Sequence, residues 1–200
     1  MENVQQIIKK NATPENDFNY PENIDGKSAL VYIGAEINAT DIVQLLIENN
    51  AQVNRKNYRG QTPLSVASGS GYTQVVKLLV DNNAEVDPFV NHTIMYRASD
   101  WYEQSALYEA SRYGHTDIIA ILIENKAAVN QLYGSESPLY FASRYNYLEI
   151  VKLLIENNAD INLANDEGKT PLYVASLNGH LEALNLFLEL IKLVEIFSLG

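Results

Sequence analysis

The chain of 200 residues contains no cysteine, which excludes disulfide bonds, thiolate-bound metals and a cysteine nucleophile. Basic residues are scarce, because 14 lysines and arginines stand against 25 aspartates and glutamates and leave a net charge of −11. Nucleic acids and anionic membranes repel an acidic surface, so we expect neither as a partner. Met1 to Lys10 lacks the hydrophobic segment of a signal peptide, and four charged residues interrupt the most apolar stretch, 181–199. We therefore expect a cytoplasmic location and leave a nuclear one open.

The sequence also lacks the common catalytic motifs. It contains no His-Glu-x-x-His, no Gly-x-Ser-x-Gly and no phosphate-binding glycine loop. The many acidic residues recur at equivalent positions of the repeats described next, which is typical of a solvated helix face. We expect no enzymatic activity, no cofactor and no metal site.

What the chain does contain is an internal repeat. Residues 61–68 (QTPLSVAS) return as 136–143 (ESPLYFAS) and 169–176 (KTPLYVAS), and weaker copies lie at 27–34 and 104–111. A second, apolar block follows each copy except the last, where the pattern changes. The leucines that anchor the first block are spaced 34, 43, 32 and 33 residues apart; they are Leu30, Leu64, Leu107, Leu139 and Leu172.

A Thr-Pro-Leu block at a period near 33 resembles the ankyrin repeat, and five copies agree over residues 23–189. The resemblance implies an all-α solenoid of stacked helix–turn–helix units with short hairpin loops. We expect an N-terminal half-repeat cap and long loop at 1–22, five repeats at 23–189 with an insertion near 88–99, and an apolar C-terminal helix or cap at 190–200. It also implies a scaffold that binds another protein without catalysis.

Local chemistry supports the two helices of each repeat. We expect Thr62 and Thr170 to cap the first helix, whose first turn tolerates proline. Small residues should lie where helices approach closely, namely Ala67, Ala110, Ala142 and Ala175. The second helix should end at asparagines in left-handed conformation, which are Asn50, Asn83 and Asn158. Lys126 stands at the same position, and we expect a frayed or differently closed helix end there.

Two regions depart from the repeat. The 43-residue step places about ten extra residues around 88–99, and these either contact a partner or reflect a tolerated loop insertion. At the C-terminus, residues 190–197 are mostly apolar and are expected to continue the last helix. They either cover the end of the stack or mediate dimerisation. His115 and His180 follow glycine, as in the ankyrin pattern, and are expected to be structural.

In ankyrin proteins the partner usually lies in a groove between the hairpin tips and the first helices. Carried onto this sequence, those positions in repeats two to four are rich in Trp, Tyr and Arg, the residue types that dominate interface hot spots. Their arginines would attract an acidic segment of a partner. The alternative is that the Arg–Tyr pairs stack on each other along the array. The predicted partner-binding residues are Tyr58, Arg59, Trp101, Tyr102, Gln104, Arg112, Tyr113, Tyr133, Arg144 and Tyr145.

Two other functions stay open. The chain could serve as the recognition arm of a larger adaptor or effector protein, or it could be a structural protein that self-associates through its C-terminal helix. We expect a monomer, with dimerisation through that helix as the alternative.

Overall fold

The computed structural model describes residue 35 and residues 38–56, 60–87, 105–133 and 135–198, with side chains up to Lys192. Within these residues the chain forms nine α-helices and no strand beyond an isolated bridge between Tyr133 and Glu136. The helices are α3 (Thr40–Glu48), α4 (Pro63–Gly69), α5 (Thr73–Asp81), α6 (Ala106–Tyr113), α7 (Thr116–Glu124), α8 (Pro138–Arg144), α9 (Leu148–Glu156), α10 (Pro171–Leu177) and α11 (Leu181–Ser198). The predicted insertion near 88–99 and the half-repeat at 1–22 lie outside the described residues.

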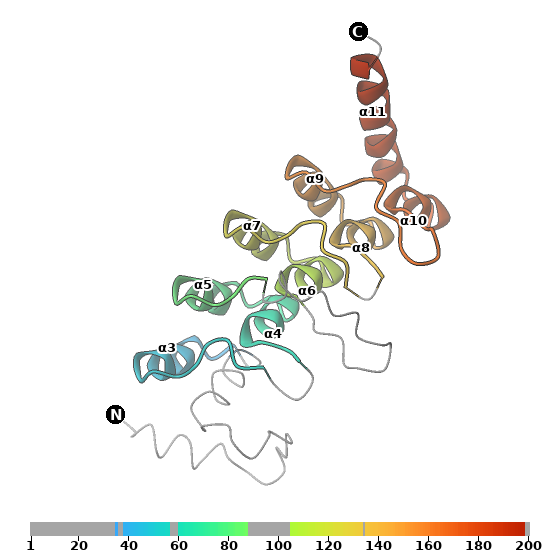
Figure 1. The fold of residues 1–200 in the computed structure, drawn as a ribbon. Helices are drawn as coiled ribbons and strands as arrows, with labels where there is room; N and C mark the ends of the chain where they lie inside the picture. Colours follow the sequence, from blue (N-terminus) through green and yellow to red (C-terminus); the bar gives the residue numbers. More distant parts are fainter. Residues whose placement is uncertain (1–34, 36–37, 57–59, 88–104, 134, 199–200) are drawn as a thin grey trace.

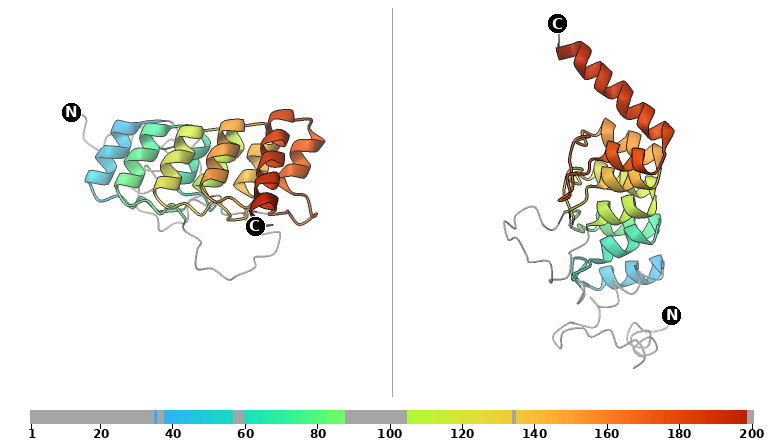
Figure 2. Two further views of the ribbon diagram at one scale, coloured as in Figure 1. Left: turned by 90° about the horizontal axis from the view of Figure 1, so that it is seen from above. Right: turned by 90° about the vertical axis from the view of Figure 1, so that its right-hand side faces the viewer.

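The helices form two parallel rows (Figure 1). The first helices of successive repeats, α4, α6, α8 and α10, pack side by side in one row, and α3, α5, α7 and α9 form the other. Figure 2 shows the same regular stack from two further directions. Each repeat therefore contacts its neighbours, as expected of a solenoid. The predicted all-α repeat architecture is confirmed.

Each described first helix begins with the same cap. The hydroxyl oxygens of Thr62, Ser105, Ser137 and Thr170 accept a hydrogen bond from the backbone N–H three residues later, at 3.0–3.2 Å. Proline follows the cap in α4, α8 and α10, where no N–H is needed within the helix. The predicted caps at Thr62 and Thr170 are confirmed. The four predicted small residues, Ala67, Ala110, Ala142 and Ala175, are fully buried, as close helix contact requires.

The second helices end in left-handed residues. Asn50, Asn83 and Asn158 have φ of 63°, 65° and 67°, which confirms their predicted role. Lys126 has φ 67°, and its N–H donates to the carbonyl of Ile123 at 2.8 Å, as the asparagines do at their own helix ends. The expectation of a frayed end at Lys126 was wrong. Burial of the next residue, Ala127, and the shared backbone hydrogen bonds impose the turn on a residue that disfavours it.

Helix α11 is longer than the other second helices, as the sequence predicted. Counting from each helix start, Ile191 occupies the position of Asn50, Asn83 and Asn158. A β-branched residue is strongly disfavoured in the left-handed conformation, so the chain continues as helix instead of turning. Phe187 and Ala183 are fully buried and attach α11 to the stack, whereas its C-terminal half projects beyond α10 (Figure 2).

Side chains in the hairpin loops link neighbouring repeats. Asn54 accepts from the N–H of Glu85 at 2.8 Å and donates to the carbonyl of Asn83 at 3.2 Å. Asn130 does the same one junction later, with the N–H of Asp160 at 2.7 Å and the carbonyl of Asn158 at 3.0 Å. At the junction between these two, Asp87 takes the place of asparagine and accepts from the N–H of Ala128 at 2.5 Å.

Replacing Asp87 by asparagine should stabilise the array by about 1 kcal/mol at neutral pH, the net value of a typical hydrogen bond. A carboxylate can only accept, whereas an amide would also donate to the carbonyl of residue 126, the equivalent of Asn83 and Asn158. Burial already raises the pKa of Asp87, although the hydrogen bond from Ala128 opposes the rise. Urea unfolding at pH 7 measures the gain, and a destabilised Asp87→Asn protein would contradict this role.

Candidate functional site

Two tyrosine–arginine pairs stand at equivalent positions of neighbouring repeats. Arg112 and Tyr113 are the last residues of α6, whereas Arg144 is the last residue of α8 and Tyr145 is its C-cap. Each guanidinium lies over the ring of the tyrosine next to it, with its carbon 5.5 Å and 5.7 Å from the ring centroids. Tyr113 is 52% exposed and Tyr145 44% exposed, so both rings are accessible to a partner. Cation–π contact of this kind holds long side chains in place at the surface.

The two pairs are also coupled across the junction between α6 and α8. Burial lowers the pKa of Arg112, but the neighbouring Tyr113, Tyr108 and Glu109 outweigh it, and Tyr145 of the next repeat acts in the same direction, so the pKa of Arg112 is raised. Burial raises the pKa of Tyr108, and the neighbouring Arg112 opposes that rise. The structure thus brings Arg112, Tyr113 and Tyr145 together. The cation–π contacts form within each pair, and Tyr145 lies near enough to Arg112 to contribute to its raised pKa.

Tyr133, the predicted contact residue of a hairpin loop, belongs to an aromatic cluster. Its ring lies 5.5 Å from that of Tyr108, which in turn meets Phe141 edge-on at 5.0 Å. Phe141 stacks on Tyr145 at 6.2 Å. Tyr133 is half-buried, so it braces the hairpin against α6 and presents only part of its surface. The cluster fixes the position of Tyr145 through Phe141.

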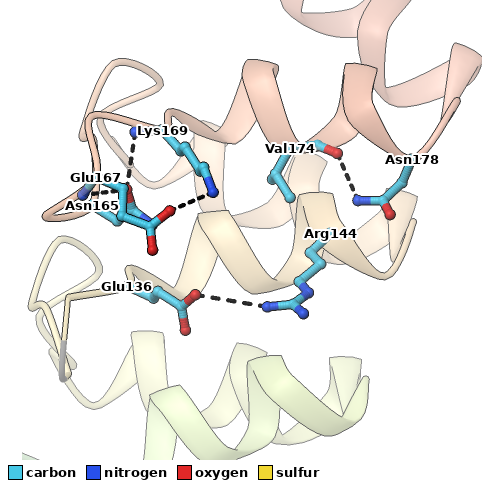
Figure 3. A network of polar contacts seen from close by, with 7 residues as sticks. All are labelled: Glu136, Arg144, Asn165, Glu167, Lys169, Val174 and Asn178. Carbon is cyan, nitrogen blue, oxygen red and sulfur yellow. Dashed lines mark hydrogen bonds and ion pairs between the residues drawn. The ribbon is translucent and has the colours of Figure 1, made fainter.

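Charges near Arg144 are partly balanced within the chain (Figure 3). Arg144 lies 3.7 Å from the carboxylate of Glu136, which precedes α8, and both side chains are partly exposed. In the next repeat Lys169 pairs with Glu167, and the side chain of Asn165 accepts from the N–H groups of both residues. Exposed ion pairs of this kind contribute little to stability, so a carboxylate from elsewhere could replace Glu136 at Arg144 at small cost.

A buried acid escaped the sequence analysis. Glu109 of α6 is only 6% exposed, and its Oε1 has no hydrogen-bond partner in the described part of the chain. A Cβ atom at Gly69 would lie 3.2 Å from its Oε2, so the side chain packs against the end of α4. Burial raises the pKa of Glu109 to about 7, and Arg112 opposes this only in part. Alignment of the repeats could have revealed it, because Val66, Phe141 and Val174 occupy the position of Glu109 in the other described repeats.

The two histidines of the repeat turns are structural, as expected. The Nε2 atom of His115 lies 3.0 Å from the carbonyl oxygen of Gly69, and that of His180 lies 2.9 Å from the carbonyl oxygen of Arg144. Each therefore links the second helix of its repeat to the first helix of the preceding one. Among the described residues no group of three or more acidic or histidine side chains could hold a metal ion.

Five of the predicted contact residues lie outside the described residues, and the structure places the other five as given above. The five outside are Tyr58, Arg59, Trp101, Tyr102 and Gln104. At the far end of the stack, Leu181 and Leu188 of α11 are 68% and 47% exposed. Dimerisation through this helix stays a prediction, which light scattering of the purified chain tests. In the ranges that the structure describes, no helix has the length and apolar character needed to cross a bilayer.

A comparison of the chain with models of protein families agrees with the regular stacking described above. The model for ankyrin repeats (3 copies) matches three overlapping stretches that together span nearly the whole chain, residues 1–90, 86–165 and 133–196. The chain belongs to the ankyrin-repeat family. Ankyrin repeats are generally protein–protein interaction modules, so the family points to binding of another protein. A comparison with curated protein sequences finds no match.

Proposed function

We propose that this ankyrin-repeat chain captures a partner protein in the groove along its first helices, centred on repeats two to four. The observation that carries the proposal is the pair of exposed tyrosines, Tyr113 and Tyr145, each held against an arginine. Tyrosine and arginine are enriched at interface hot spots because they bury large areas at small entropic cost. Hairpin residues of the same repeats complete the proposed surface, namely Tyr58, Arg59, Trp101, Tyr102, Gln104 and Tyr133. No step of this function requires catalysis.

The partner segment is proposed to be acidic. Arg112 and Arg144 place two guanidinium groups on neighbouring first helices of a chain whose net charge is −11. Arg112 lies over the ring of Tyr113 and, among the described residues, makes no ion pair with a carboxylate, so a carboxylate of the partner can pair with it. A carboxylate brought by the partner would gain charge-assisted hydrogen bonds from both arginines. Such complementarity speeds association and selects the partner.

Replacing Tyr113 and Tyr145 together by alanine should abolish partner capture and leave the helical content unchanged. Each hot-spot tyrosine contributes at least about 2 kcal/mol to binding, so each loss weakens binding by about 30-fold or more. Proteins retained by the immobilised wild-type chain from its native cell are identified by mass spectrometry. Binding of the retained protein to each variant is then measured by calorimetry, and circular dichroism reports helicity.

The matched control is Tyr173→Ala, because Tyr173 is 49% exposed but lies on α10, beyond the proposed groove. The proposal expects this variant to bind like the wild type. Equal binding by the double variant, or equal losses in the double variant and the control, would show that the partner uses another surface.

A further inference from the structure

The junction between α4 and α6 contains an acid where the other junctions contain an apolar side chain. Val66 of α4, Phe141 of α8 and Val174 of α10 occupy the position of Glu109 in their repeats, and both Phe141 and Val174 are buried. Glu109 is buried to the same degree, and its Oε1 finds no hydrogen-bond partner among the described residues. Glu109 therefore occupies a position of the stack that is apolar in the other described repeats.

The surroundings offer little to balance a negative charge. Helix α4, against which Glu109 packs, contains no titratable side chain, and Gly69 presents only backbone to the carboxyl group. On α6 itself, Arg112 is the only cation; it lies over the ring of Tyr113 and offsets only part of the effect of burial on Glu109. At the N-cap of α7, the ring of His115 lies against Gly71, and its Nε2 atom is 3.0 Å from the carbonyl oxygen of Gly69. At the end of α8, Tyr145 contributes to the raised pKa of Arg112, and Arg144 lies beside the carboxylate of Glu136.

Ionisation of Glu109 consequently works against the packing of this junction. A neutral carboxylic acid can remain among apolar neighbours, but a carboxylate without full hydrogen bonding or pairing is costly to bury. Separation of α4 from α6 would let the carboxylate regain its hydration. Deprotonation therefore favours the open junction, and the pKa of Glu109, raised to about 7 by burial, places this change near neutral pH.

We propose that the α4–α6 junction is a proton-controlled joint, closed while Glu109 is protonated and loosened when it ionises. A solenoid is stabilised mainly by contacts between neighbouring repeats, so one weak junction divides the array into two parts. Helices α3, α4 and α5 lie on one side of the joint, and α6 to α11 lie on the other. The inference does not depend on the partner proposed above, although Arg112 and Tyr113 lie on the same helix as Glu109 and would shift with it.

Hydrogen exchange of the intact chain at several pH values tests the joint. Between pH 5 and pH 8 the opening equilibrium at α4 and α5 should increase on the order of 50-fold, as linkage requires for a carboxyl whose pKa falls to its ordinary value on opening. Protection factors, which correct for the intrinsic pH dependence of exchange, measure this increase. Amides of α8 and α9, which lie together on the same side of the joint, should keep their protection over the same range.

Two variants make the test specific. Glu109→Gln, which has nearly the same shape and no charge, should remove the pH dependence at α4 and α5. Glu124→Gln, which removes an exposed acid on α7, should leave the dependence intact. Glu109→Val, which restores the residue type of the other junctions, offers the same comparison if the amide variant folds poorly. Unchanged pH dependence in the Glu109 variants, or uniform loss of protection over the whole array in the wild type, would overturn the proposal.

Discussion

Replacing Glu109 by valine should raise the free energy of unfolding at pH 8 by about 3 kcal/mol, because a pKa shift of one unit corresponds to about 1.4 kcal/mol. The folded pKa of about 7 exceeds the ordinary value of 4.5 for glutamate because the side chain is buried. The folded chain therefore binds the proton more tightly than the unfolded chain does. The contribution of Glu109 to stability is highest below the unfolded pKa, falls as pH rises from about 4.5 to 7, and stays low above that range.

At pH 4 the glutamate is largely protonated in both states, so the valine variant should gain far less there. Urea unfolding of both proteins at pH 4, 6 and 8 measures the difference as a function of pH. Glu109→Gln should follow the same trend without the added apolar packing. A valine variant that is equally stabilised at all three pH values would mean that volume, and not charge, determines the stability of this junction.

The sequence predicted the regular part of the molecule because the same residue types recur at equivalent positions of the repeats. Threonine before proline marks a helix start, alanine marks the closest helix contact, and asparagine marks the left-handed helix end. Each of these assignments is confirmed at several residues. Lys126 was misjudged because propensity was weighed without the stack, whose burial of Ala127 imposes the same turn.

The candidate site was less predictable, since it depends on differences between repeats. Arg112 and Tyr145 belong to different repeats, and their proximity follows from the way α6 packs on α8. The ion pair of Arg144 with Glu136 depends on how a side chain turns back along its own helix, which no spacing predicts. Glu109 was visible in the aligned copies as an acid among apolar residues. It was overlooked because acidic residues elsewhere in the repeats form a solvated face.

Glycines in the turns between the two helices of a repeat show why some positions tolerate no side chain. Gly114 has φ 82°, and a Cβ there would lie 2.9 Å from the ring of Tyr147 in the next repeat. Gly179 has φ 71°, but a Cβ there would meet nothing within 4 Å. The two positions share a left-handed backbone, which would strain any residue with a Cβ, and differ in packing. Asn146 holds the equivalent place before Tyr147 with φ 58°, so a residue with a Cβ is accepted in that turn.

Gly114→Ala should therefore cost about 3 kcal/mol of unfolding free energy, whereas Gly179→Ala should cost about 1 kcal/mol, because both introduce left-handed strain but only the first overpacks a junction. Urea unfolding of the two variants provides the comparison. Replacing Tyr147 by alanine in the Gly114→Ala background should recover most of the difference, since it removes the ring that the new methyl group meets. Equal losses at the two glycines would show that backbone strain alone sets the cost, and that Tyr147 has room to move as the repeats stack.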